Sequence, residues 1–280
     1  MPAVAEKRRT FRRLHETGCF VTPNPWDVGS ARYLQSLGFQ ALATTSAGAA
    51  FALALADGAV PRDAMLAHIG ALAAVSDVPV NADFGNGYAD EPDEVGRNVQ
   101  LCVATGVAGL SIEDSTGDRT RPLYEVELAV QRVRAARAAI DASGEDVVLT
   151  GRAEGMLGHD PDLERTIARL SAYSEAGADC LYAPGLTTRE QIAAVVAAVA
   201  PKPVNVLALP STGLTVGDLA ELGVRRVSVG GGLARTAWGA FMRAARAIAG
   251  DGRFDGMADA ASGVELNRLF HDEAKRRQPS

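Results

Sequence analysis

The sequence lacks three features that would each point to a class of protein. Its three cysteines, Cys19, Cys102 and Cys180, lie far apart and form no CxxC pair, which argues against a zinc site and fits a reducing cytoplasm. No block of Lys and Arg is interleaved with aromatic residues, and the formal net charge of −6 argues against nucleic acid as a partner. No stretch is apolar and long enough to span a bilayer, and the basic N-terminus lacks the apolar run of a secretory signal. We therefore expect a cytoplasmic protein with neither a nucleic-acid nor a membrane partner.

The chain does have enough apolar sequence for one large core. Its 280 residues are 47% hydrophobic, and no low-complexity segment or flexible linker divides them. We expect a single domain over residues 1–280, in which residues 253–280 form a C-terminal helical extension. This extension contains an amphipathic stretch at residues 264–275 that a closed barrel does not require, and we expect it to pack on a neighbouring subunit.

Short apolar, β-rich runs alternate with longer Ala/Leu/Arg segments of helical period, which is typical of a parallel sheet covered by helices. The eight runs are residues 19–24, 41–45, 79–84, 109–114, 147–154, 179–184, 203–209 and 225–230. Four of them follow a helix end and a glycine, at Gly38, Gly106, Gly177 and Gly223, and glycine adopts the left-handed conformation of such a helix end at little cost. Eight βα units in this length predict an α/β protein with a (β/α)₈ (TIM) barrel. An open doubly wound sheet is the alternative, but no GxGxxG follows the first strand.

Polar residues gather where the predicted strands end, and barrel enzymes carry their sites at these C-terminal ends. They are Thr44, Thr45, Ser46, Ala47 and Gly48 after the second strand, Asp57 in the loop beyond, Asn81 and Asp83 on the third, Glu113 and Asp114 on the fourth, and Arg152 and Glu154 on the fifth. Carboxylates that face one mouth repel each other, and a hard divalent cation with oxygen ligands relieves that repulsion. The arginine can then clamp a substrate carboxylate in bidentate fashion.

Other groups in the chain have structural interpretations. Either Asp83 or Asp114 alone would more often cap a helix, so the functional interpretation depends on the convergence of four strand ends. The run Gly230-Gly231-Gly232 could bind an anion or form a tight turn. The histidines, His15, His68, His159 and His271, share no strand end or helix face, and we expect them at the surface or in loops. Cys102 and Cys180 are expected to be buried and inert.

Several motifs, taken in order, resemble the isocitrate lyase/phosphoenolpyruvate mutase superfamily. They are NPWDVGSARYL, ATTSAGAAF, the ADG that contains Asp57, NADFGNGYAD, GLSIED, TGRAE and LYAPGL, and they cover nearly the whole predicted barrel from about Phe11. The resemblance implies a barrel with Mg²⁺, or Mn²⁺, a terminal helix exchanged between subunits, and a homotetramer built as a dimer of dimers. It also implies chemistry through a metal-bound enolate of pyruvate or a related 2-oxo acid.

The resemblance also assigns roles to residues of the site. Ser46, Ala47 and Gly48, with Thr45 beside them, correspond to the loop that holds the substrate carboxylate, and Asn205 is assigned to substrate binding with them. Arg152 corresponds to the anion-clamping arginine. Asp57, Asp83 and Glu113 correspond to the carboxylates around the metal, with Asn81 at the position of a direct ligand. Arg152, Glu113 and Asp57 are the residues assigned to catalysis.

Departures from the family pattern narrow the activity. Asn81 stands where the family's DxD has its first Asp. The residues after Glu113 read DSTGDRTRPLY. At this place the isocitrate and methylisocitrate lyases carry a KKCGH-type loop whose cysteine serves as the acid. Ala183-Pro184 stands where the mutases carry a histidine, and the mutases' longer gating loop is missing. The closest branch in motif is therefore the one that resembles oxaloacetate decarboxylases.

The leading hypothesis is a Mg²⁺-dependent lyase that cleaves a C–C bond in, or decarboxylates, a small 2-oxo acid or 2-hydroxy-diacid. A phosphonopyruvate-type C–P mutase or hydrolase is the second hypothesis. A non-catalytic protein that binds a 2-oxo acid, such as 2-oxoglutarate, is the third. The general acid stays open among Tyr88, Asp114, Arg119 and Glu154.

Overall fold

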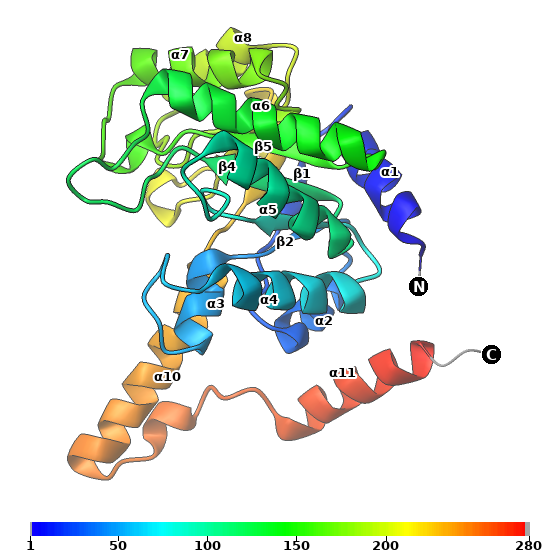
Figure 1. The fold of residues 1–280 in the computed structure, drawn as a ribbon. Coiled ribbons are helices and arrows are strands. Elements are labelled where there is room, and N and C mark those ends of the chain that lie inside the picture. Colours follow the sequence, from blue (N-terminus) through cyan, green and yellow to red (C-terminus); the bar gives the residue numbers. More distant parts are fainter. Residues whose placement is uncertain (1, 278–280) are drawn as a thin grey trace.

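The strands form one parallel sheet that curls into a nearly closed barrel (Figure 1). The structure, a computed structural model, describes residues 2–277. The strands are β1 (Phe20–Thr22), β2 (Leu42–Ala43), β3 (Val80–Asp83), β4 (Gly109–Glu113), β5 (Val148–Arg152), β6 (Cys180–Tyr182), β7 (Val204–Leu207) and β8 (Arg226–Ser228). The order is β1-β8-β7-β6-β5-β4-β3-β2, and β1 pairs with β8. The predicted barrel is therefore confirmed, and the open doubly wound alternative is wrong.

Helices follow the strands and cover the outside of the barrel. They are α1 (Val4–Leu14), α2 (Val28–Ser36), α3 (Ser46–Ala52), α4 (Arg62–Val75), α5 (Pro92–Ala104), α6 (Val126–Ser143), α7 (Leu163–Glu175), α8 (Arg189–Val199), α9 (Val216–Glu221), α10 (Gly232–Asp251) and α11 (Gly263–Arg276), with 3₁₀ turns η1 (Gly155–Leu157), η2 (Pro210–Thr212) and η3 (Asp255–Met257). Gly38, Gly106, Gly177 and Gly223 all have positive φ. The prediction that glycines end these helices is therefore confirmed. Within residues 2–277, no helix is long and apolar enough to cross a membrane.

At the C-terminal ends of the strands, one backbone hydrogen bond and one asparagine side chain close the barrel. β1 and β2 are the two ends of the sheet, and the Ala43 N–H donates to the Pro23 carbonyl at 3.1 Å. Asn24 donates from Nδ2 to the Thr44 carbonyl at 2.7 Å, and its Oδ1 accepts from the N–H groups of Val229 and Gly230, both at 2.9 Å. One side chain thus joins the ends of β1, β2 and β8.

Helix α1 packs under the N-terminal ends of the strands. Phe11 is fully buried there, and the Lys7 ammonium donates to the carbonyls of Ala73 and Ser76 at 3.0 and 3.1 Å. His15, at the end of α1, packs edge-on against the rings of Phe11 and Phe20. His15 lies in the turn that follows α1, so the expected loop position is confirmed, and its ring is only partly exposed there.

The C-terminal helices leave the barrel. Figure 1 shows α10 extending beyond the strands and α11 running back alongside the body, away from the sheet. α11 confirms the helix expected at residues 264–275, and it meets the body where Arg277 donates to Asp77 at 2.7 Å. Large apolar side chains stay exposed on this part of the chain, among them Phe241 (60%), Phe254 (66%) and Val264 (79%). The expected packing on a second subunit stays a prediction.

Candidate active site

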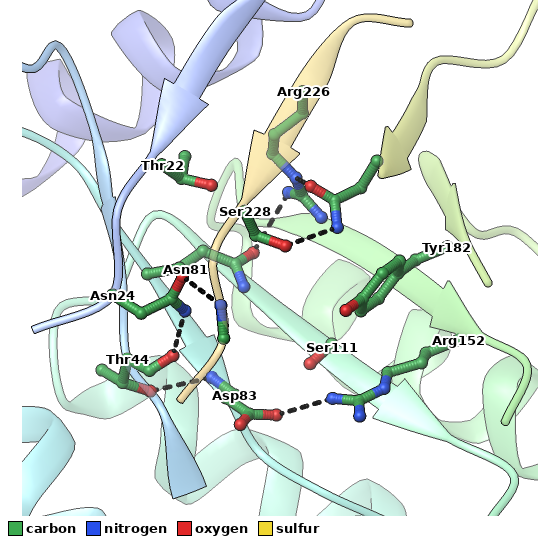
Figure 2. Close-up of a pocket in the computed structure, with 13 residues that line it drawn as sticks. Thr22, Asn24, Thr44, Asn81, Asp83, Ser111, Arg152, Tyr182, Arg226 and Ser228 are labelled. Carbon is green, nitrogen blue, oxygen red and sulfur yellow. Dashed lines mark hydrogen bonds and ion pairs between the residues drawn. The ribbon is translucent and has the colours of Figure 1, made fainter. Parts of the chain in front are cut away.

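The candidate site lies at the C-terminal ends of the central strands. Glu113 on β4 is in register with Arg152 on β5, and Arg152 is in register with Tyr182 on β6. Asp83 ends β3 and faces Arg152 across the barrel mouth (Figure 2). Parallel strands bring these ends together, which is why residues far apart in sequence meet here.

Arg152 is the centre of an ion-pair network. Its Nη1 lies 3.1 Å from an Asp83 oxygen and 3.3 Å from a Glu113 oxygen, and its Nε pairs with Glu154. Its guanidinium also lies 5.1 Å from the centroid of the Tyr182 ring. Burial lowers the pKa of Arg152, but the charges of Glu113 and Glu154 outweigh burial and raise this pKa well above its ordinary value. The sequence led us to expect an Arg152 that is free to bind substrate. In the structure Arg152 instead binds three carboxylates.

The mouth holds more negative than positive charge. Burial raises the pKa of Glu113, the charges of Glu154 and Asp83 add to this increase, and Arg152 opposes it. Desolvation and the charge of Asp83 raise the pKa of Asp57. One guanidinium thus faces four carboxylates, and the surplus favours binding of a cation.

The side chains at the mouth are of the type that binds a hard divalent cation, but they are not gathered around one point. Asp57, Asp83 and Glu113 supply the carboxylate oxygens that Mg²⁺ prefers. Within residues 2–277, however, no group of three or more His, Cys, Asp or Glu side chains is gathered as a metal-binding cluster. The reason is that Arg152 lies between Asp83 and Glu113.

The loop after β2 is held against Asp83. The Ser46 N–H donates to Asp83 Oδ2 at 2.8 Å, and the Asp83 N–H donates to Thr44 Oγ1 at 2.9 Å. Ser46 Oγ donates to Asp57 Oδ1 at 3.2 Å. The structure therefore brings Ser46, Asp57 and Asp83 together, as the sequence predicts.

The three residues beside Ser46, at the start of α3, have capping and packing roles. Thr45 is buried and caps α3, because its Oγ1 accepts from the Gly48 N–H at 3.2 Å. A Cβ on Gly48 would lie 2.7 Å from the Thr45 methyl carbon and 2.8 Å from Trp26 Cβ, so glycine is required for packing here. Ala47 lies beside the glycine turn, since a Cβ on Gly231 would lie 3.4 Å from its methyl group. The Gly48 N–H is therefore already used within the cap.

A polar layer lies below the mouth, and the sequence reasoning missed most of it. Asn81 and Asn205, predicted at the mouth, are buried in this layer together with Thr150, Arg226 and Ser228. Asn205 donates from Nδ2 to Ser228 Oγ at 3.0 Å and accepts from Arg226 Nε at 3.0 Å. The available signal was the alternation of polar residues along β5, β7 and β8, because alternate residues of a barrel strand face inward.

A small cavity separates this layer from the mouth. About 40 Å³ is open to water-sized molecules between residues that include Asn81, Asp83, Arg152, Tyr182 and Arg226. This volume holds a few waters, since one water needs roughly 10–15 Å³ by this measure.

The four candidates for the general acid are in different environments. Asp114 is buried and accepts from the Tyr173 hydroxyl at 2.6 Å, from Arg169 at 3.1 Å and from the Glu154 N–H at 2.8 Å, so it positions Glu154. Glu154 itself pairs with Arg152. Arg119 is exposed in the loop that follows β4.

Tyr88 is the candidate with a strained backbone close to the carboxylates. Its φ is +58°, which is rare for a bulky residue, and its N–H donates to Asn86 Oδ1 at 3.0 Å. Burial raises the pKa of Tyr88, and the charges of Asp83 and Glu113 raise it further. The phenol therefore keeps its proton at neutral pH and is a weak acid.

Known proteins match most of this chain. The phosphoenolpyruvate phosphomutase family matches residues 11–249. An uncharacterised protein of Mycobacterium tuberculosis is 36% identical over 224 residues, which are 79% of this chain and 81% of that protein. An oxaloacetate decarboxylase of Pseudomonas fluorescens is 30% identical over 251 residues, which are 83% of this chain and 82% of the relative.

Solved structures share the fold over almost the full length. A protein assigned as a lyase or mutase from Burkholderia cenocepacia superposes with a TM-score of 0.92 and 48% identity, covering 96% of this chain and 97% of that chain. Oxaloacetate acetylhydrolase with its product oxalate superposes with a TM-score of 0.86 and 27% identity, covering 98% and 97%. Phosphonopyruvate hydrolase with oxalate and Mg²⁺ superposes with a TM-score of 0.84 and 25% identity, covering 96% of each.

Proposed function

This chain belongs to the phosphoenolpyruvate mutase/isocitrate lyase superfamily, and from that premise we propose that it is a Mg²⁺-dependent lyase of a small 2-oxo acid or 2-hydroxy-diacid. The family match confirms the resemblance of the motifs and the expectation of an enzyme of this superfamily. The observation that carries the proposed reaction is the group of Asp83, Glu113 and Glu154 around Arg152 at the barrel mouth.

Asp83, Glu113 and Asp57 would hold Mg²⁺, or Mn²⁺ in its place. The surplus of carboxylate charge at the mouth supports this choice, as does the relative solved with Mg²⁺ and oxalate. When bound, the metal acts as a Lewis acid that polarises the 2-oxo or 2-hydroxy group and stabilises enolate charge.

Arg152 has the geometry to bind the substrate carboxylate. A carboxylate of the substrate would replace one of the three acidic side chains on the guanidinium, and the planar fork of arginine suits such bidentate exchange. The Ser46 backbone N–H at the start of α3, now bound to Asp83, would supply a neutral donor to this carboxylate.

The bond changes are those of an enolate-forming cleavage. For a 2-oxo-diacid, the bond from C3 to the distal carboxylate breaks, CO₂ leaves, and the electron pair forms the enolate of pyruvate. For a 2-hydroxy-diacid, a base takes the hydroxyl proton while the C2–C3 bond breaks to a carbonyl and an enolate. We assign Tyr88 as the residue that then protonates the enolate carbon: its raised pKa keeps the phenol protonated, and the strongly basic enolate takes that proton.

Product-resolved NMR tests the proposal. Purified protein with Mg²⁺ is incubated with oxaloacetate, isocitrate, methylisocitrate, dimethylmalate and phosphonopyruvate, with and without EDTA. Because Mg²⁺ alone can promote loss of CO₂ from oxaloacetate, a reaction with Mg²⁺ and without protein is subtracted. We expect EDTA-sensitive release of a pyruvate-type product. Saturable binding of 2-oxoglutarate without turnover of any compound would instead support a binding protein.

A C–P reaction is the second candidate, because phosphonopyruvate hydrolase superposes on the chain over 96% of its length. Phosphorus NMR on phosphonopyruvate separates it from C–C cleavage, since only a C–P reaction releases phosphate or moves the phosphoryl group.

We also propose a cytoplasmic homotetramer, built as a dimer of dimers, in which α11 packs on a second subunit. The exposed apolar side chains of α10 and the following residues, such as Phe241 and Phe254, support this assembly. Light scattering coupled to size-exclusion chromatography measures the mass of the particle in solution, and the mass of a monomer would contradict this assembly.

A further inference from the structure

A buried arginine lies beneath the candidate site without an acidic partner. Arg226 on β8 is 3% exposed, and no Asp or Glu of residues 2–277 forms an ion pair with it. Its guanidinium donates instead to neutral acceptors, Asn205 Oδ1 at 3.0 Å and Thr150 Oγ1 at 2.9 Å. Its Nη1 also lies 3.4 Å from both Asn81 Oδ1 and His15 Nε2. A buried charge without a counterion is costly, so its neighbours are positioned to accept from it.

Arg226 determines which way the amide of Asn81 points. A guanidinium has only N–H donors, so the Asn81 atom that faces it is the oxygen. Gly109 on the neighbouring strand leaves room for this side chain, because a Cβ there would lie 2.7 Å from the same oxygen. The amide nitrogen of Asn81 donates to the Ala82 carbonyl at 3.2 Å. Figure 2 shows Asn81 between Arg226 on one side and the Asp83–Arg152 pair on the other.

We propose that Arg226 is a positioning residue that keeps Asn81 from acting as a metal ligand. Arg226 holds the Asn81 oxygen, while the amide nitrogen is bound to the Ala82 carbonyl, so neither end of the amide is free for a metal. The cation is therefore left to Asp83, Glu113 and Asp57. The inference rests on the proposed metal dependence, and it names the residues that set the affinity for the metal.

The charge of Arg226 acts in the same direction. Asn81 and Asp83 are two residues apart on β3, so Arg226 lies roughly 7–10 Å below the carboxylates. At that distance a buried positive charge repels a divalent cation with little screening. Arg226 therefore weakens metal binding both by its charge and through the orientation of Asn81.

Binding of Mn²⁺, followed by electron paramagnetic resonance on the full-length protein, tests the proposal without reference to turnover. We expect Asn81→Ala to bind Mn²⁺ within about threefold of the wild type, and Arg226→Met to bind it about tenfold more tightly. In Arg226→Met the Asn81 oxygen is released, so adding Asn81→Ala to this variant should remove part of the gain. Arg226→Lys keeps the charge and should stay near the wild type. Thr22→Val changes another buried residue of the cavity and serves as the matched control.

Each outcome decides the matter. A loss of Mn²⁺ affinity of more than tenfold in Asn81→Ala would show that Asn81 is a ligand and overturn the proposal. If the wild type binds no Mn²⁺ at millimolar concentration, a folded Arg226→Met must bind it, and failure to do so overturns the proposal. Arg226→Gln takes the place of Arg226→Met if circular dichroism shows the latter to be unfolded. Because no substrate is present, failure here leaves the proposed reaction standing, and failure of the reaction leaves the Mn²⁺ result standing.

Discussion

Acid should destabilise this protein through His15. The ring Nδ1 lies 2.8 Å from the Phe11 carbonyl and Nε2 lies 3.4 Å from Arg226, so the neutral ring donates to the carbonyl and accepts from the guanidinium. Burial lowers the pKa of His15 to about 3, and the charge of Arg226 contributes, whereas the Phe11 carbonyl opposes the shift. The His15 ring therefore stays neutral in the folded protein at pH values below about 6.5, where the same ring is protonated in the unfolded chain.

The size of the effect follows from the two pKa values. Between pH 6.5 and 3 the unfolded state binds one more proton at this residue, so the free energy of unfolding decreases as the pH falls. From pH 7 to pH 4.5 the loss from His15 alone is about 2–3 kcal/mol, since one pKa unit corresponds to about 1.4 kcal/mol. This is a large part of the stability of an ordinary domain.

Urea unfolding at pH 7.0 and pH 4.5, at one fixed protein concentration, measures the loss. His15→Gln cannot take up the proton but can still accept from Arg226, so its stability should change about 2–3 kcal/mol less between the two pH values than that of the wild type. His159→Gln, which replaces an exposed loop histidine, is the control and should behave as the wild type does. An equal change in wild type and His15→Gln would refute the reasoning.

Three further predictions concern the site. Arg152→Ala should keep the fold by circular dichroism but lower kcat/KM at least a hundredfold, and unchanged kinetics would reject the assigned anion clamp. Because the pKa of Glu113 is raised, the affinity for Mg²⁺ should increase as the pH rises through that pKa. Calorimetry in two buffers with different ionisation enthalpies should then detect the release of a proton when Mg²⁺ binds, and binding without proton release would contradict this. Asp114→Asn should lower the free energy of unfolding by about 3 kcal/mol, since it leaves the partly buried Arg169 without its carboxylate, whereas Tyr173→Phe should cost only about 1 kcal/mol in the same urea titration.

The barrel was predictable because its signal repeats. Each βα unit contributes an apolar run of strand length, a helical period and, in four cases, a glycine such as Gly38 or Gly223 that now shows positive φ. The observed strands all lie within the predicted runs and are shorter at their ends, where β1 keeps only residues 20–22 of the run 19–24. Side chains at these ends turn to the site instead of continuing the sheet, which hydropathy does not reveal.

The site was predictable only as far as topology determines it. Strand ends meet in any parallel barrel, so Asp83, Glu113 and Arg152 could be grouped from sequence. The height of a residue within the barrel depends on the stagger of the strands, which no single strand encodes. Asn81 and Asn205 therefore lie lower than expected, beside an Arg226 that sequence reasoning did not select.

The asparagine that closes the barrel also connects two functional parts of the chain. The Asn24 amide binds the carbonyl of Thr44, next to the loop that carries Ser46, and it binds the N–H groups that precede α10. One planar amide thus links the start of the segment that carries Ser46 to the base of the helix that carries the exposed Phe241. Loss of this single side chain would therefore release both segments from the end of β1 at once.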